Sequence, residues 1–228
     1  MVSTAIWHAS TTPSLSRIAA AAGPAGVVVG REHGGDLAPV RLFRPEPTRA
    51  VVLGGSWVAH LVVFRCLAHG AQITVTTTSP AFWNAFKQRA GAGDDLVVQP
   101  STGVDVTAPA SAEPTGEPRL HVTDTGPTVP ARGSGSPWEC QLTIVPTLTT
   151  AGLTPVAEAD VVIVARLEER EAELLASAAR LGPADVTRLT QLHGDMFGLL
   201  ASGTLRYLWF ATTSIEEDLL GPPDIALS

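Results

Sequence analysis

Short apolar runs alternate with longer mixed segments along this chain, a pattern that predicts strands separated by helices. Two apolar runs around a Gly-Gly-Asp turn in residues 26–43 predict a β-hairpin. The run Val161–Val164 has no polar interruption, which is typical of a strand covered on both faces. Further strands are predicted at residues 49–55, 71–78, 95–100, 119–126, 139–149, 159–166 and 205–213.

Helical spacing of apolar residues predicts helices at residues 56–69, 79–93, 167–182 and 183–203, and a capped helical turn at 214–221. In the second of these helices Ser79 is the expected N-cap and Pro80 the first helical residue. The first is apolar almost all round, interrupted by His60 and Arg65, so we expect it to be covered on most sides. Strands that alternate with helices predict an α/β three-layer sandwich with a mainly parallel central sheet, of the P-loop NTPase-like or Rossmann-like kind, with an N-terminal β-hairpin.

The expected domain organisation is a poorly ordered segment at residues 1–24 and a single α/β domain at 25–228. Two stretches rich in Pro, Gly and small polar residues, near 100–118 and 125–137, predict long surface loops. With 228 residues, 45% of them hydrophobic, the chain is long enough to bury a sizeable core.

The net charge, the lysine and cysteine content and the absence of long apolar runs argue against several classes of function. A net charge of −7 argues against a nucleic-acid partner, which would require a basic face. Lys87 is the only lysine, so a phosphate-binding or Schiff-base lysine has almost no candidate. Cys66 and Cys140 make neither a disulfide framework nor a zinc site, and no metal is expected. The sequence has no signal peptide and no apolar run long enough to insert into a membrane, so we expect a cytoplasmic protein.

The glycine turn at residues 54–56, between a strand and a helix, is the main candidate for chemistry. As a dinucleotide fingerprint it gives Gly54, Ser56 and Ala59, but Ser56 blocks close backbone approach, and Thr76–Thr78 replace the acid that would bind the ribose. As a nucleophile elbow it fails because Val58 stands where the second glycine belongs. His193 and Asp195, which are neighbours in a predicted helix, do not make a compelling pair for such a nucleophile.

A third comparison extends beyond the turn. The stretch "VVVGREHGGDLAPVRLFRPEPTRAVVLGGSWVAHLVVFRCL" resembles the start of FtsK/SpoIIIE-type ATPase domains, including the EccC-like domains of type VII (ESX) secretion systems. In that family a "PIGxDxxGxPVxLDL" segment precedes "PHxLVVGxxGSGKSxLLRxL". Hairpin, strand and helix align without a gap, and the resemblance covers about residues 27–223.

The aligned P-loop positions lack the family's chemistry. The second P-loop glycine falls on Ala59, its lysine on His60 and its Ser/Thr on Leu61. The family's lysine reaches the β- and γ-phosphates, and its hydroxyl holds magnesium. Leu61 cannot bind a metal, His60 is too short and mostly neutral at pH 7, and Trp57 replaces a glycine that leaves room for phosphate.

Later motifs agree with this resemblance. "RLHVTDTG" stands where the family has "VVVIDE", so Asp124 matches the magnesium-organising acid while Thr125 replaces the glutamate that activates water. "ADVVIVAR" keeps Arg166 in a sensor-like place, and "FATTSIEEDLLGPP" resembles the family's closing segment. The resemblance therefore implies a relic nucleotide pocket without ATP hydrolysis, made of Gly54, Gly55, Ser56, Trp57, His60, Asp124 and Arg166.

What the resemblance implies about function is a non-catalytic domain of an actinobacterial type VII secretion system that acts as an interaction or regulatory component and binds no cofactor. Its partner would be another protein, an EccC-like secretion ATPase or a secreted helical-hairpin cargo, at the periphery of a membrane secretion complex. The alternative is a nucleotide- or dinucleotide-binding protein that holds ATP, ADP or NAD through backbone N–H groups at the Ser56 helix start. The sequence does not predict the oligomeric state.

Simpler structural interpretations stand beside these functional ones. His60 on an apolar helix is more often a core histidine bonded to a carbonyl than a ligand, and Asp124 at a strand end can simply cap the next loop. The Glu-rich helix at 167–182 is a solvated face or a dock for a basic partner. Two further sets are left open: core or pocket-lining tryptophans (Trp57, Trp83, Trp138, Trp209), and arginines able to bridge to an acidic neighbour (Arg41, Arg44, Arg49).

Overall fold

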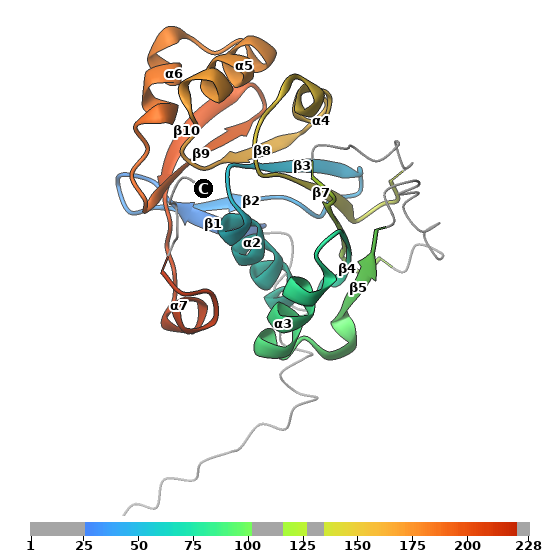
Figure 1. The fold of residues 1–228 in the computed structure, drawn as a ribbon. Coiled ribbons are helices and arrows are strands. Elements are labelled where there is room, and N and C mark those ends of the chain that lie inside the picture. The colour runs from blue at the N-terminus through green and yellow to red at the C-terminus, as the bar shows by residue number, and fades with distance from the viewer. Residues whose placement is uncertain (1–25, 102–115, 127–134, 223–228) are drawn as a thin grey trace, which may run out of the picture.

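The computed structural model describes residues 26–101, 116–126 and 135–222 (Figure 1). The segment 1–24 and most of the two expected loops near 100–118 and 125–137 lie outside the described residues. Within the described ranges the strands form one ten-stranded mixed sheet in the order β2-β1-β10-β9-β8-β3-β7-β6-β4-β5. The strands are β1 Val27–Arg31, β2 Leu37–Val40, β3 Thr48–Leu53, β4 Gln72–Thr77, β5 Leu96–Pro100, β6 Arg119–Asp124, β7 Glu139–Val145, β8 Val161–Val164, β9 Met196–Ala201 and β10 Thr204–Trp209.

Parallel pairing dominates the half of the sheet that carries the candidate turn. Strands β8, β3, β7, β6, β4 and β5 run parallel to one another, whereas β9, β10, β1 and β2 extend the sheet beyond β8 with antiparallel pairs. The mainly parallel sheet and the N-terminal hairpin, β1 paired with β2, confirm the predicted fold class.

Helices cover both faces of the sheet, as Figure 1 shows. They are α2 Ser56–Ala68, α3 Pro80–Ala90, α4 Leu153–Ala157, α5 Glu169–Ala179, α6 Pro183–Thr190 and α7 Ser214–Leu220, with 3-10 turns η1 Gly93–Asp95 and η2 Thr150–Gly152. The larger core lies under α2, α3 and α7, and includes Leu61, Trp83 and Leu219. The smaller core lies under α4, α5 and α6, and includes Val156 and Leu175. The sheet is thus the middle of three layers, and one core lies between it and the helices on each of its faces.

A close contact with the backbone of β10 determines where the N-terminal hairpin joins the sheet. β1 pairs with β10 at Arg31 and Trp209. A Cβ built on Gly30 would lie 2.5 Å from the Trp209 carbonyl oxygen and 2.8 Å from the Phe197 ring. Glycine is therefore required at this point because no side chain fits between the two strands.

The prediction of one helix over 183–203 is wrong in its second half. Helix α6 ends at Thr190, and Met196–Ala201 form β9, between β8 and β10. Phe197 and Leu200 of β9 belong to the cores on opposite sides of the sheet, so the strand is apolar on both faces. Such a strand has no alternation to separate it from a buried helix. The short helix α4 was not predicted, and Ser79 makes no side-chain cap bond although it precedes α3.

Three further findings concern the helices, the cysteines and the metal-ligating side chains of the described residues. None of their helices combines the length and the apolar character that crossing a bilayer requires. Cys66 and Cys140 are free and buried, and burial raises the pKa of both thiols. No group of three or more metal-ligating side chains occurs within the described ranges.

Candidate functional site: the β3–α2 turn

Three of the predicted site positions lie at one edge of the sheet. Gly54 follows β3, Asp124 ends β6, and Arg166 comes two residues after β8. β8, β3, β7 and β6 are parallel neighbours in that order, so their carboxyl ends meet at this edge. In open α/β sheets this is the edge at which ligands bind.

The turn connects β3 to α2 through Gly54 and Gly55. Gly54 has φ +79°, a left-handed conformation that favours glycine, and its N–H donates to the Val145 carbonyl at 3.2 Å. Gly55 is the N-cap of α2, and the helix start has no side-chain cap. Gly54 and Gly55 are half-buried and Ser56 is exposed. The first N–H groups of α2 are thus not capped by a side chain of the helix start.

His60, at the position of the P-loop lysine, is a core residue. Its Nδ1 lies 2.6 Å from the Ser56 carbonyl oxygen, and its ring centroid is 4.3 Å from that of Trp83 and 4.8 Å from that of Phe82. Burial lowers the pKa of His60 to about 4, despite the opposing effects of the Ser56 hydrogen bond and the Asp124 charge. Among the described residues Nε2 has no hydrogen-bond partner. At neutral pH this side chain is an uncharged part of an aromatic cluster.

Leu61, at the position of the magnesium-binding hydroxyl, is also in the core. It is 2% exposed and lies with Val29 of β1 and Ile163 of β8 around one small apolar cavity. Ala59, at the position of the second P-loop glycine, is fully buried. Leu61 has no side-chain oxygen and is buried, so the position of the magnesium-binding hydroxyl does not fit a Mg²⁺–nucleotide complex.

Trp57 points toward the C-terminal end of the described chain. Its Nε1–H donates to the Gly221 carbonyl at 3.1 Å, and its ring meets Phe210 edge-on with centroids 5.0 Å apart. Trp57 and Trp83 are buried, as predicted for core tryptophans, whereas Trp138 and Trp209 are half-buried.

Asp124 is tied to the neighbouring strand and helix. Its Oδ2 accepts hydrogen bonds from Trp83 Nε1 at 2.8 Å and from Thr77 Oγ1 at 3.2 Å. Its main-chain carbonyl accepts from Thr78 N at 3.2 Å. The carboxylate of Asp124 therefore joins α3 to β4 and takes part in the cluster around His60, whereas most of the loop that it was expected to cap lies outside the described residues.

Arg166 lies on the other side of the turn. It is half-buried and lines a hollow with Leu167, Val186 and residues at the start of α5 and on α6. The main-chain oxygen of Arg166 would be 3.4 Å from a Cβ at Gly54. Within the described part of the chain no interaction joins Arg166 to His60 or Asp124. The structure therefore gathers His60 and Asp124 on the α3 side and leaves the Arg166 side chain apart.

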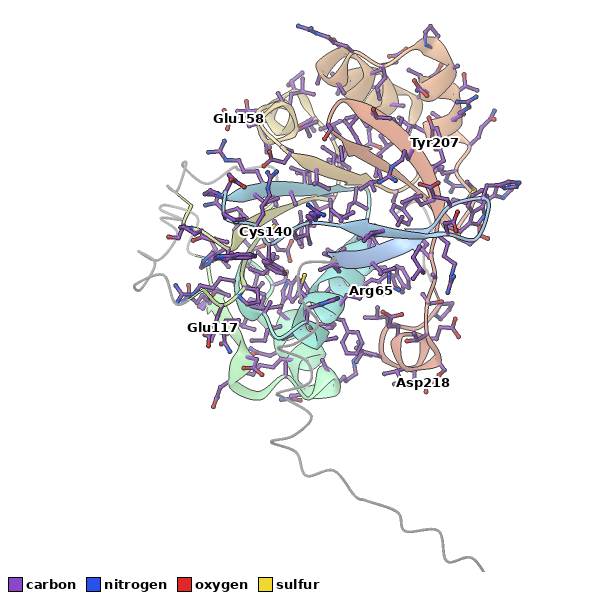
Figure 2. The ribbon with its side chains drawn as sticks, turned by 180° about the vertical axis from the view of Figure 1, so that it is seen from behind. Arg65, Glu117, Cys140, Glu158, Tyr207 and Asp218 are labelled. Carbon is purple, nitrogen blue, oxygen red and sulfur yellow. The ribbon has the colours of Figure 1, made fainter. Side chains whose placement is uncertain are left out.

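Sequence reasoning missed the most extensively bonded charged pair. Arg65 Nε donates to Glu216 Oε1 at 2.6 Å and Arg65 Nη2 to Glu216 Oε2 at 3.0 Å, with side chains only 11% and 5% exposed. Arg65 also donates to the carbonyls of Val28 and Ala211, so it ties α2 to β1 and to the segment before α7 (Figure 2). Burial raises the pKa of Glu216, but hydrogen bonds from Arg65 and Thr213 and the Arg65 charge outweigh it and leave the pKa lowered.

Arg44, between β2 and β3, and Arg49, in β3, form ion pairs within the chain. Arg44 Nη2 lies 2.9 Å from Asp160 Oδ1, and Arg49 Nη1 lies 4.0 Å from Glu158 Oε2. These pairs fix the amino ends of β3 and β8. Arg44 and Arg49 therefore bridge to acidic residues of their own chain, and Arg41 remains exposed.

Comparison with known proteins identifies the fold and not the family. No protein-family model matches the sequence, and no curated relative does. Among solved structures, VirB4 of Thermoanaerobacter pseudethanolicus is similar with a TM-score of 0.58 at 8% identity, over 84% of this chain and 98% of that one. The genome packaging NTPase B204 of Sulfolobus turreted icosahedral virus 2, in complex with AMPPCP, is similar with a TM-score of 0.50 at 9% identity, over 75% of this chain and all of that one. The chain has the P-loop NTPase fold that these neighbours share.

Proposed function

We propose that this protein is a non-catalytic P-loop-like domain that works by binding another protein. In this proposal the P-loop NTPase fold is kept as a scaffold, and ATP hydrolysis has been lost. The proposed setting is a secretion system of the type VII kind, at the periphery of its membrane complex.

One observation carries the proposal: the two side chains that a P-loop directs at phosphate and magnesium are core side chains here. His60 is 4% exposed and lies among aromatic rings, and Leu61 is 2% exposed and lies beneath β1. The lysine and the bound metal carry much of the charge stabilisation in phosphoryl transfer. Replacing both with buried, uncharged groups removes that stabilisation, and Thr125 offers no carboxylate to activate water.

The proposed setting and partners rest on sequence resemblance. The order of short motifs across residues 27–223 resembles EccC-like secretion ATPase domains, and the similarity to VirB4 is consistent with that scaffold. The natural partners in this proposal are a neighbouring EccC-like ATPase domain or a secreted helical-hairpin cargo. A protein partner suits a domain whose net charge of −7 disfavours nucleic acid.

A second candidate function, nucleotide binding without hydrolysis, is favoured by one specific observation. Ser56 is exposed at the start of α2, and the half-buried Gly54 keeps the left-handed turn conformation. Backbone N–H groups at a helix start can hold a phosphate without any lysine. This candidate needs no magnesium, and it would make the protein a nucleotide sensor.

Calorimetric titration separates the two candidates. The protein is titrated with ATP, ADP and NAD, each with and without magnesium. The proposed function predicts no binding down to millimolar affinity for any of them. Micromolar, magnesium-independent binding would replace it with the sensor, and magnesium-dependent binding would mean that the metal site lies elsewhere than the Leu61 position.

A further inference from the structure

Two short helices on either side of α2 carry opposite charge (Figure 1). α3, Pro80–Ala90, contains Lys87 and Arg89 and no acidic residue. α7, Ser214–Leu220, contains three acidic residues and no basic one. In a chain with a net charge of −7, α3 by itself therefore carries a positive charge.

α7 has an outward face that the fold does not use. Its inward side is Leu219 and Glu216, and it is held mainly by polar contacts: the Arg65–Glu216 pair and the Trp57 bond to Gly221. Ile215 is 67% exposed, the most exposed of the large hydrophobic side chains in the described ranges. Asp218, three residues further along the same flank, is exposed, and Glu217 is exposed on the other flank, where its Oε1 accepts a hydrogen bond from Thr212. The helix is thus fixed in place while it presents an isoleucine and two acids to solvent.

α3 has an exposed stripe of matching character. Trp83 and Phe86 face the core, whereas Phe82 is 53% exposed. Phe82, Ala85 and Arg89 follow one another at helical spacing along one exposed flank. This stripe presents one large apolar ring, one small residue and one positive charge. Lys87 is half-buried on the other flank and lies outside this stripe.

We infer that α7 of one copy of this chain docks on α3 of a second copy. In this contact Ile215 packs against Phe82 and Ala85, and the carboxylate of Asp218 faces Arg89. The inference rests on the proposed protein-binding function and names one partner for it, a second copy.

The charges decide the kind of contact. Pairing α3 with α3, or α7 with α7, would place like charges together, which disfavours a symmetric dimer through either helix. Pairing α7 with α3 joins two different surfaces, so association through one such contact is head-to-tail and leaves the pair with one free α3 and one free α7. The patches are small, so the contact is weak, and because its charges are exposed it weakens as salt rises.

Sedimentation velocity on the full chain tests the contact, over a concentration series at low and at physiological ionic strength. The wild-type protein is expected to associate as concentration rises, and less so at higher salt. Ile215→Asp is expected to weaken association about tenfold or more, since it removes the apolar anchor. Leu37→Asp is the matched control, because Leu37 is 51% exposed on β2, away from both helices, and is expected to leave association unchanged.

Charge-reversal variants in the same sedimentation experiment give the most decisive test of the contact. Arg89→Glu and Asp218→Lys are each expected to weaken association when alone. An equimolar mixture of the two variants is expected to regain it, because intact α7 of the first meets intact α3 of the second. Arg41→Glu, which makes the same charge change at an exposed linker position, is expected to behave as wild type. Unchanged melting temperatures would show that the variants are folded.

A protein that stays monomeric at all concentrations, or a mixture that fails to regain association, would overturn the head-to-tail inference. Neither result touches the proposed function, because the nucleotide titration decides that separately. Conversely, association that survives together with tight, magnesium-independent nucleotide binding would retain the contact and replace the proposed function with the nucleotide sensor.

Discussion

Acid is expected to destabilise the protein through His60. Burial lowers the pKa of this imidazole from 6.5 to about 4, and the side chain is 4% exposed. The unfolded chain therefore binds a proton at this residue at a higher pH than the folded protein does. Stability is full above about pH 6.5 and is lost as pH falls toward 4, because protonation favours the unfolded state over that window.

The size of the effect follows from the pKa difference. One pKa unit corresponds to about 1.4 kcal/mol, so a shift of about 2.5 units costs about 3 kcal/mol once pH is below 4. By pH 5 the loss is about 2 kcal/mol, a large fraction of the stability of an ordinary domain. His121, whose pKa burial also lowers, contributes with the same sign.

Urea denaturation at pH 7, 6, 5 and 4.5 measures this loss. His60→Gln replaces the imidazole with a side chain that does not titrate, so it is expected to lower stability at pH 7 and to flatten the pH dependence to the part due to His121. His193→Gln, at an exposed position, is the matched control and is expected to keep the wild-type slope. Equal slopes for His60→Gln and wild type would refute the assignment of His60 as a neutral core residue.

Two other substitutions test the contacts that hold the fold. Arg65→Met leaves the Glu216 carboxylate buried without its partner and is expected to cost about 3 kcal/mol in the free energy of unfolding, whereas Arg206→Met, which breaks an exposed pair with Glu32, is expected to cost under about 1 kcal/mol. Gly30→Ala forces a methyl against the Trp209 carbonyl and is expected to cost about 2 kcal/mol, whereas Gly34→Ala has only an Asp36 oxygen at 3.8 Å and is expected to be near neutral. Urea denaturation measures all four, and equal losses within either pair would contradict the account of that contact.

The alternation of apolar runs was enough to predict most of the parallel half of the sheet. β3, β4, β6 and β8 lie where strands were predicted, because each is a short apolar run bounded by turn residues or by a helix. The hairpin β9–β10 was missed although a local signal existed. Ser202 and Gly203 form its two-residue turn, both with positive φ, as a type I′ turn requires.

The candidate site also has features that the sequence predicted and features that it did not. The apolar surroundings of His60 in the sequence favoured a core histidine, and its aromatic contacts agree. The Arg65–Glu216 pair joins residues 151 positions apart, and nothing in the local pattern around Arg65 points to its partner. The separation of Arg166 from Asp124 likewise depends on tertiary packing, which periodicity does not encode.

The most direct test of the central claim is to follow the backbone amide signals of Gly54, Gly55 and Ser56 by two-dimensional NMR during titration with ATP. These N–H groups are the ones that a working phosphate turn would use. The account predicts that their chemical shifts stay unchanged up to millimolar ATP, with or without magnesium. Saturable shifts centred on these three residues would contradict it, because they would show that the turn still binds a nucleotide.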